Sequence, residues 1–395
     1  MASPQPASIL NTDFCLQIAK HVGLKEIEKG LNFGFSPLSV HVVLSMIATG
    51  SKGHTLEQML QFLKSESIEE LNSLSSRLVH LISADGAGIG GPHLSFTNGI
   101  WVEQSFPLKP AFRDIVNSIY KAEARAIDFR MQADKVAHQV NSWIKSSTNG
   151  LIKELLPSGS LDRSTMLVLA NAIYFKGAWS TMFDGSKTQD RDFFLLDGSI
   201  SRAAFMASNK KKHFLHSFDG FKVLKLPYQH GNTDRRFSMY FILPHKRYGL
   251  PNLIKNFDLN SGFLGHHLKL WEVEAGRVQL PRFKISFGLE ASGIIKELGL
   301  YSPFSKQGGL TEMVDYQELF VSKIFHKSFV GVNEEGTEAA AATAALVAYN
   351  CSSSRLHQMD FVADHPFMFM IKEEVSGVVL FIGNVLNPSY KFLIC

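Results

Sequence analysis

The chain has 395 residues, 45% of them hydrophobic and 19% charged, with a formal net charge of +4. Its small net charge gives no reason to expect nucleic-acid binding, and no apolar run approaches the ~18 residues of a membrane span. The three cysteines, Cys15, Cys351 and Cys395, are odd in number and lack CxxC spacing, which argues against a disulfide framework and a structural zinc site. We therefore expect a globular protein with a large core, without metal or cofactor, that binds neither nucleic acid nor membrane.

The first residues, Met1 to Ser8, lack the basic start and apolar stretch of a secretory signal peptide. Free cysteines suit a reducing compartment. The expected location is the cytoplasm, or the cytoplasm and the nucleus.

Helices are predicted for the first part of the chain. Ile9 to His21 has an amphipathic pattern, and Ser36 followed by Pro37 is typical of a helix start. The helix after Ser36 is almost wholly apolar, so it should be buried, and Gly50 and Gly53 end it. Two capping boxes follow, Thr55 to Gln58 and Ser67 to Glu70, and each predicts the start of a further helix.

The run Gly86 to Gly91 satisfies the GxGxxG pattern of a dinucleotide-binding loop. A phosphate-binding fingerprint needs a strand before it and a helix after it. Here the pattern follows a predicted helix and leads through Pro92 into a predicted strand, Leu94 to Val102. We interpret the run as a loop.

Strands dominate the rest of the chain. A helix between Asp134 and Pro157 stops at Gly150, and the apolar strand Met166 to Ala170 continues into Asn171 to Trp179. One later helix is predicted, Leu289 to Leu298. The other predicted strands are Val223 to Leu226, Phe237 to Leu243, Val278 to Phe287, Lys323 to Asn333, Phe367 to Ile371 and Val378 to Ile382. No repeat or low-complexity linker divides the chain, so one domain, 1–395, of mixed α+β class is expected.

The segment Glu334 to Met359 lies between two predicted strands and is about twice as long as an ordinary connection. Its first half is made of small, uncharged residues. A short helix is one interpretation, because alanine favours helices, but no apolar stripe would anchor it. In an extended conformation alternate side chains share a face, so Thr337, Ala339 and Ala341 would lie together on a face that can be buried.

This segment resembles the reactive-centre loop of the serpins, whose hinge carries the same Glu-Glu-Gly-Thr-Glu-Ala-Ala-Ala sequence. The resemblance covers essentially the whole chain. It includes Ser36 to Ser39, Val140 to Ile144 and the specific stretch Asn171 to Trp179. Three further stretches are similar to the plant branch of the family: Asp219 to Leu224, Arg235 to Tyr240 and Phe361 to Phe367. The resemblance implies a serpin fold with three β-sheets, eight or nine helices and an exposed reactive-centre loop at about residues 334–360.

The resemblance also implies four groups of functional residues. The hinge of the loop would be Glu334, Glu335, Gly336, Thr337, Glu338, Ala339, Ala340, Ala341 and Ala342. Counting from Gly336 places the reactive bond at Asn350-Cys351, with Tyr349 as the neighbouring subsite residue. A polar shutter beneath the main sheet would comprise Ser36, Ser39, Asn171 and His326. A breach at the top of the sheet would comprise Trp179, Arg282 and Glu334, with Arg282 where most relatives carry lysine.

The function implied is protease inhibition, not catalysis. In the serpin mechanism a protease cuts the reactive bond, the loop inserts into the main sheet, and the protease is trapped covalently. The expected partner is a serine or cysteine protease, legumain-like because of Asn350 or papain-like because of Tyr349, and the expected inhibitor is a monomer. The alternative is a non-inhibitory serpin that acts as a binding or carrier protein. Asn350 also begins an N-x-Ser sequon, and a glycan there would block most proteases.

The sequence also bears on two other interpretations, an enzyme and a protein with a basic binding site. The chain has no GxSxG, HExxH or P-loop sequence, and Cys351 as a nucleophile has no base that the sequence can assign. The basic run Lys210 to His213, with Arg235 and Arg236, fits a polyanion site, a nuclear signal or a solvated charged loop.

Overall fold

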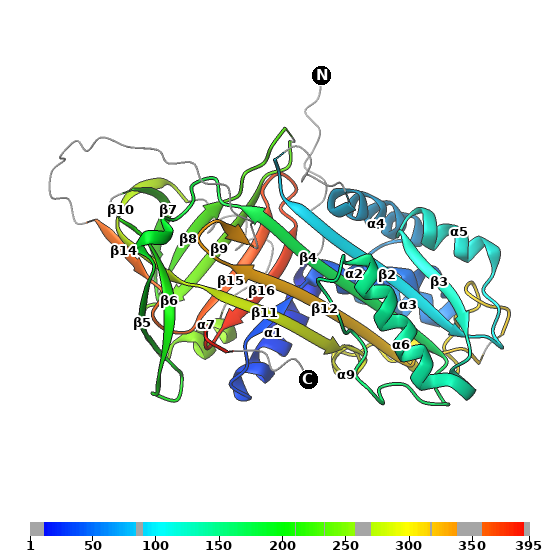
Figure 1. The fold of residues 1–395 in the computed structure, drawn as a ribbon. Helices are drawn as coiled ribbons and strands as arrows, with labels where there is room; N and C mark the ends of the chain where they lie inside the picture. Colours follow the sequence, from blue (N-terminus) through cyan, green and yellow to red (C-terminus); the bar gives the residue numbers. More distant parts are fainter. Residues whose placement is uncertain are drawn as a thin grey trace, which may run out of the picture.

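A computed structural model of the chain describes residues 12–83, 90–209, 211–232, 234–256, 270–316, 318–337 and 358–390. Within these ranges helices and strands are mixed along the chain, which confirms the predicted α+β class. The described residues contain eight α-helices and sixteen strands, and the strands form two sheets (Figure 1). None of the helices in these ranges is long and apolar enough to cross a membrane.

The N-terminal helices follow the predicted signals, with one exception. Helix α1 covers Thr12–Glu28 and so continues beyond the predicted end at His21. Helix α2, Pro37–Thr49, begins where the Ser36 hydroxyl accepts the backbone N–H of Ser39. Helix α2 is buried along its whole length, as its apolar sequence predicts. Helix α4, Ile68–Ser83, also begins as predicted, because the Ser67 hydroxyl accepts the N–H of Glu70.

The predicted capping box at Thr55 is wrong. Helix α3, Gly53–Leu63, begins two residues before Thr55, with Lys52 at the N-cap position and no side-chain cap. The Gln58 side chain instead accepts the backbone N–H groups of Tyr301 and Ser302. The capping-box pattern therefore predicted a helix correctly but placed its start wrongly. Gln58 does not cap the helix and instead makes a tertiary contact.

The smaller sheet carries the features that matter for function. Its long strands are β2 (His93–Glu103), β3 (Ala122–Ile127), β4 (Leu167–Ala178), β11 (Phe283–Glu290) and β12 (Lys323–Val332), and a sixth, two-residue strand, β13, covers Gly336–Thr337. The order across the sheet is β11-β12-β13-β4-β2-β3, and β12 also pairs directly with β4. The two strands that flank β13 are thus neighbours along most of their length.

Helices cover both faces of this sheet (Figure 1). On one face lies α6, Phe129–Ser147, and the buried residues between α6 and the sheet, among them Trp101, Val140 and Ala172, form a core cluster of their own. On the other face α2 packs against β4 and against the larger sheet, inside the main core. The central strands β4 and β12 are therefore buried on both sides, which explains the continuous apolar run at the start of β4.

The larger sheet has ten strands and divides at β10. Residues Glu272 to Glu274 of this strand pair with β7, whereas the following residues pair with β6 and β14. Treating the two parts separately gives three sheets in all, the number that was expected. The strands are β1 (Phe33–Phe35), β5 (Gln189–Phe194), β6 (Ile200–Asn209), β7 (Lys212–Phe218), β8 (Phe221–Pro227), β9 (Phe237–Pro244), β10 (Glu272–Pro281), β14 (Met359–Val362), β15 (Phe367–Glu373) and β16 (Val379–Val385).

One predicted strand, Val278 to Phe287, is two strands. It breaks at Arg282 between β10 and β11, which belong to different sheets. Pro281 lies at the break and cannot donate to a ladder, which makes a change of sheet possible there. The predicted helix Leu289 to Leu298 is likewise shorter, because Leu289 and Glu290 belong to β11 and helix α9 covers only Ser292–Glu297.

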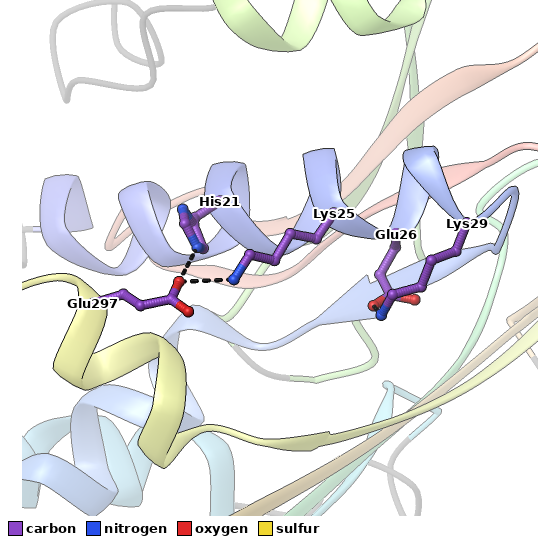
Figure 2. Close-up of polar contacts among 5 residues, drawn as sticks. All are labelled: His21, Lys25, Glu26, Lys29 and Glu297. Carbon is purple, nitrogen blue, oxygen red and sulfur yellow. Dashed lines mark hydrogen bonds and ion pairs between the residues drawn. The ribbon is translucent and has the colours of Figure 1, made fainter.

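An exposed ion cluster ties the first helix to α9 (Figure 2). The Glu297 carboxylate lies 2.7 Å from both His21 Nε2 and Lys25 Nζ of α1. The same two bonds hold the pKa of Glu297 below its ordinary value.

Helices α5 (Pro110–Ser118) and α7 (Leu250–Asn256) complete the described α-helices.

Candidate functional site

The candidate site is the place where β4 and β12 part. From Lys323 to Phe329, β12 pairs in parallel with Val168 to Tyr174 of β4. Beyond this point β13 lies between the two strands and pairs antiparallel with both. The sheet is thus closed along most of the β4–β12 seam and open at one end, where β13 fills the gap.

A tight turn leads the chain from β12 into this gap. The Asn333 side chain accepts the backbone N–H groups of Glu335 and Gly336 at 3.0 and 3.1 Å, and the N–H of Asn333 donates to Gly336 O. A Cβ on Gly336 would lie 2.0 Å from the carbonyl oxygen of Gly177, a backbone atom that cannot yield. Glycine is therefore required at 336 because the hinge backbone lies directly against β4.

Thr337 is fully buried, and its side chain has a specific partner. Its hydroxyl lies 2.7 Å from the hydroxyl of Tyr228, and Thr337 stands opposite Gly177 in the sheet register. Gly177 provides the space, since a Cβ there would lie 2.9 Å from the Tyr228 ring. Burial raises the pKa of Tyr228 well above its ordinary value, so the phenol stays neutral. Thr337, the first of the alternate small residues expected to face the core, is thus already buried in the uncleaved chain.

The residues expected in the breach lie around the same turn. The Trp179 indole donates to Asn333 O at 2.9 Å, and the Trp179 backbone N–H donates to Glu335 O. The Glu334 carboxylate accepts from Thr188 Oγ1 at 2.6 Å and lies 3.6 Å from Arg282 Nε. The structure therefore brings Trp179, Glu334 and Arg282 together at the open end of the seam.

Lower on the seam, three polar side chains form a row across three neighbouring strands. Asn98 of β2 is the register partner of Asn171 in β4, which is the partner of His326 in β12. All three are buried. Asn171 Nδ2 donates to Asn98 Oδ1 at 2.5 Å, and Asn98 Nδ2 donates to Tyr120 O. The row bridges the β4–β12 seam because His326 Nδ1 lies 3.2 Å from Asn171 Oδ1.

The bonding pattern fixes the protonation of His326. The backbone N–H of Ser36 can only donate, so His326 Nε2 accepts it, at 3.3 Å, and the ring proton lies on Nδ1, facing Asn171. Burial, with a smaller contribution from the charge of Lys327, lowers the pKa of His326 from 6.5 to about 3. A protonated ring would also set two donors against each other at Nε2. The row is therefore satisfied only when His326 is neutral.

The expected serines lie where the row meets α2. Ser36 binds His326 through its backbone and caps α2 with its hydroxyl, so it joins the helix to the row. Ser39 is buried on α2, and its hydroxyl has no hydrogen-bond partner among the described residues. Ser328, two residues after His326, donates to Gly34 O at 2.5 Å and ties β12 to β1.

Two residues of the site were missed in the sequence. Asn98 carried a usable signal. In the predicted strand Leu94 to Val102 it shares a face with apolar residues such as Phe96 and Ile100, and a polar side chain on a buried face needs a hydrogen-bond partner. Tyr228 carried none, since it follows a short predicted strand and resembles any aromatic residue at a strand end. Only the fold brings Tyr228 to Thr337, 109 residues away in the chain.

The expected reactive bond Asn350-Cys351 lies outside the described residues. The same holds for Tyr349, for the hinge residues Glu338, Ala339, Ala340, Ala341 and Ala342, and for Lys210 of the basic run. Of the other basic residues, Lys212 stands opposite Glu274 in the register of β7 and β10, and Arg235 donates to Leu81 O. Among the described residues, no three His, Cys, Asp or Glu side chains are grouped so that they could hold a metal ion.

Taken together, the geometry suits a change of pairing in the sheet. A two-residue strand occupies one end of the β4–β12 seam, and the segment that continues from it has small side chains at alternate positions. Moving that segment down the seam requires breaking the direct pairing of β4 and β12 and the His326–Asn171 contact. New ladders on both sides of the inserted strand would replace these bonds.

Comparison with known proteins gives one consistent result. The family model for the serpins, described as serine protease inhibitors, matches residues 10–388. Curated relatives include Serpin-ZXA of Oryza sativa subsp. japonica, 52% identical over 91% of this chain and 91% of the relative. Serpin-ZX of Arabidopsis thaliana is 48% identical over 96% of this chain and 98% of the relative. The solved structure of Arabidopsis AtSerpin1, in its native stressed conformation, is 44% identical, covers 98% of this chain and 100% of that one, and has a TM-score of 0.89.

Proposed function

The chain belongs to the serpin family, with plant Serpin-Z proteins among its relatives, and we propose that it inhibits a protease by the suicide-substrate mechanism. The observation that carries the proposal is the position of β13. Gly336 and Thr337 already pair with β4, and Thr337 also pairs with Val332 of β12, at the open end of the seam. The rest of the loop has only to continue along a path that its first residues have started.

The chemistry of trapping is performed by the protease. Its serine or cysteine nucleophile attacks the carbonyl carbon of Asn350, and the peptide bond to Cys351 breaks. The amine of Cys351 takes a proton and leaves as a new N-terminus, while Asn350 stays bound to the protease as an ester or thioester. At this stage the loop is free at one end.

Insertion of the freed loop would then prevent hydrolysis of the acyl bond, the step that would release the protease. The segment from Thr337 to Asn350 spans ~50 Å as an extended strand, so the acylated protease is carried the length of the sheet. Dragging the nucleophile away from the oxyanion hole removes the donors that hydrolysis needs. The acyl bond therefore persists. The small residues after Thr337 support this proposal because they can be buried at alternate positions without voids or charges to desolvate.

Asn350 before the scissile bond favours a legumain-like protease, and Tyr349 favours a papain-like one with an apolar second subsite. Such an inhibitor acts as a monomer, is not itself an enzyme, and works in a compartment where Asn350 carries no glycan. A glycan on that residue would block the bond. The cytoplasm meets this condition.

The test is to incubate the protein with a panel of serine and cysteine proteases and look for complexes that survive denaturation. Mass spectrometry of the peptide released from a stable complex should show Cys351 at its N-terminus. A peptide that begins at Leu356 would overturn the assignment of the bond. Clean cleavage by every protease without any stable complex would overturn the proposed function and favour a binding or carrier protein.

A further inference from the structure

Tyr228 hydrogen-bonds through its side chain to the side chain of Thr337 in β13. It follows β8 directly, and its hydroxyl lies 2.7 Å from Thr337 Oγ1. Both side chains are buried. Its other hydrogen-bond contact is the sulfur of Met239 at 3.5 Å, a weak acceptor. The threonine hydroxyl is therefore the principal polar partner of a phenol that would otherwise lie among apolar groups.

The body of the protein holds this phenol in place, independently of the loop. The Tyr228 ring stacks on Trp179 with 4.6 Å between ring centroids, and Phe175 lies 4.8 Å away on a tilted plane. The backbone N–H of Tyr228 donates to Phe237 O, and Tyr228 forms a bridge with Trp179. A hydroxyl positioned in this way presents a preformed partner, so little ordering is needed when residue 337 arrives.

The position is selective for a particular side chain. Thr337 faces Gly177, which leaves room for the tyrosine ring and a small residue but for little more. An alanine at 337 would fit but would leave the phenol without its oxygen partner. A large or charged residue would not fit. The requirement is thus for a small side chain with a hydroxyl, which both threonine and serine meet.

We propose that Tyr228 is the docking residue for the hinge: its hydroxyl selects a hydroxyl at position 337 and holds this hinge residue inside the sheet before any protease arrives. Insertion then extends a strand that is already paired on both sides and does not have to create one. We assign Tyr228 a positioning role, because its contact is with the hinge residue Thr337. Its effect on trapping rests on the proposed function, but its effect on the hinge does not.

The hinge itself is tested by hydrogen exchange of the 333–337 backbone amides in the uncleaved protein. Tyr228→Phe and Thr337→Val each remove one hydroxyl and keep the shape, so each should speed exchange of this segment about five- to tenfold. Thr337→Ser keeps the bond and should exchange at nearly the wild-type rate. The double variant should exchange no faster than about the faster single variant, because both changes remove the same bond.

Tyr240→Phe is the matched control, since Tyr240 is also a buried tyrosine, and its hydroxyl bonds to Glu374 at 2.7 Å in the larger sheet. It should leave exchange at 333–337 unchanged. Unchanged exchange in both Tyr228→Phe and Thr337→Val would overturn the docking proposal, as would effects in the double variant that simply multiply.

The second measurement is the number of inhibitor molecules consumed per protease trapped. For Tyr228→Phe this number should rise about two- to fivefold, and Thr337→Ser should stay close to wild type. If no variant, including wild type, traps a protease but the exchange pattern holds, the proposed function fails and the docking role stands. If wild type traps efficiently and exchange is insensitive to Tyr228, the docking role fails alone.

Discussion

The middle and the open end of the β4–β12 seam arrange the same pair of strands in opposite ways. In the middle of the seam the strands pair directly, and the row Asn98, Asn171 and His326 bridges them on the core side. At the open end the strands have parted, and a two-residue strand stands between them. One region holds the two strands together, and the other holds them apart.

The difference lies in how the polar groups are satisfied. In the middle of the seam, His326 and Asn171 can bond only while β4 and β12 are adjacent. Separating the two strands therefore leaves buried donors and acceptors without partners. At the open end, the backbone of β13 pairs with both strands, and the hydroxyl groups of Tyr228 and Thr337 bond to each other. The barrier to insertion is thus expected in the middle, and the starting point of insertion at the end. Four changes test this division.

The largest effect is expected for Thr337→Arg. Thr337 is fully buried, so a guanidinium there would need to be desolvated without a charged partner, which costs several kcal/mol. A slowing of insertion by ~3 kcal/mol is more than a hundredfold in rate, so hydrolysis should outrun trapping and the protein should behave as a substrate. Kinetic titration should show the inhibitor consumed per protease rising steeply.

Glu338→Arg is the control for this change, because neighbouring residues of an extended strand point to opposite faces and residue 338 would then face away from the core. It should alter the titration little. Trapping with near-unit stoichiometry by Thr337→Arg would show that a small buried side chain at residue 337 is not needed for insertion.

The next effect is expected in the middle of the seam, for Asn171→Ala. The change removes the partner of His326 Nδ1 and of Asn98 Oδ1 at once. Buried groups left unsatisfied cost about 1–3 kcal/mol each, so the free energy of unfolding should fall by roughly 3 kcal/mol. Urea unfolding measures it. Asn252→Ala, on the exposed surface of α7, should cost under about 1 kcal/mol. Equal losses for the two variants would mean that the row contributes nothing to closure.

Acid should act on the same row. Burial lowers the pKa of His326 from 6.5 to about 3 and that of His41, on α2, from 6.5 to about 4. Between these values the unfolded chain binds protons that the folded chain does not, so stability falls as the pH drops below about 6.5. Each histidine contributes up to ~1.4 kcal/mol per pH unit. Unfolding free energies measured from pH 7.5 to 4.5 should show this slope, and His326→Gln should reduce it. An identical slope in the variant would contradict the assignment.

The smallest effect is expected at the open end, for Arg282→Lys. Half of the Arg282 side chain is exposed, its Nε lies 3.6 Å from Glu334, and Glu334 keeps its bond to Thr188 in the variant. Exposed ion pairs contribute about 0–1 kcal/mol, so both melting temperature and trapping should change little. A large loss of trapping would mean that the ion pair, not the docked hinge, holds this end in place.

The sequence predicted the architecture well and the site in part. The fold class, the buried helix α2 and the strands on both sides of the seam follow from apolar periodicity, and the serpin resemblance named His326 and Asn171 together. Register could not be predicted, because whether residues 98, 171 and 326 share one row depends on how three distant strands align.

Two other gaps have similar causes. The predicted strand Val278 to Phe287 alternates apolar and polar residues, with one change of phase between Leu280 and Phe283. Such a change fits a bulge as well as a change of sheet, so periodicity alone could not show that β10 and β11 belong to different sheets. The contact between Tyr228 and Thr337 joins a strand end to the loop segment across 109 residues, a pairing that no local pattern encodes. Nonlocal contacts of this kind account for most of what the sequence left open.

The central claim is that the segment following β13 inserts between β4 and β12 once the loop is cut. Thermal unfolding of the uncleaved chain and of the chain cleaved within residues 338–357 tests it most directly. Insertion adds a full strand to the smaller sheet, so the cleaved protein should unfold at a much higher temperature than the uncleaved one, and Thr337→Arg should abolish most of this rise. Equal unfolding temperatures before and after cleavage would contradict the claim.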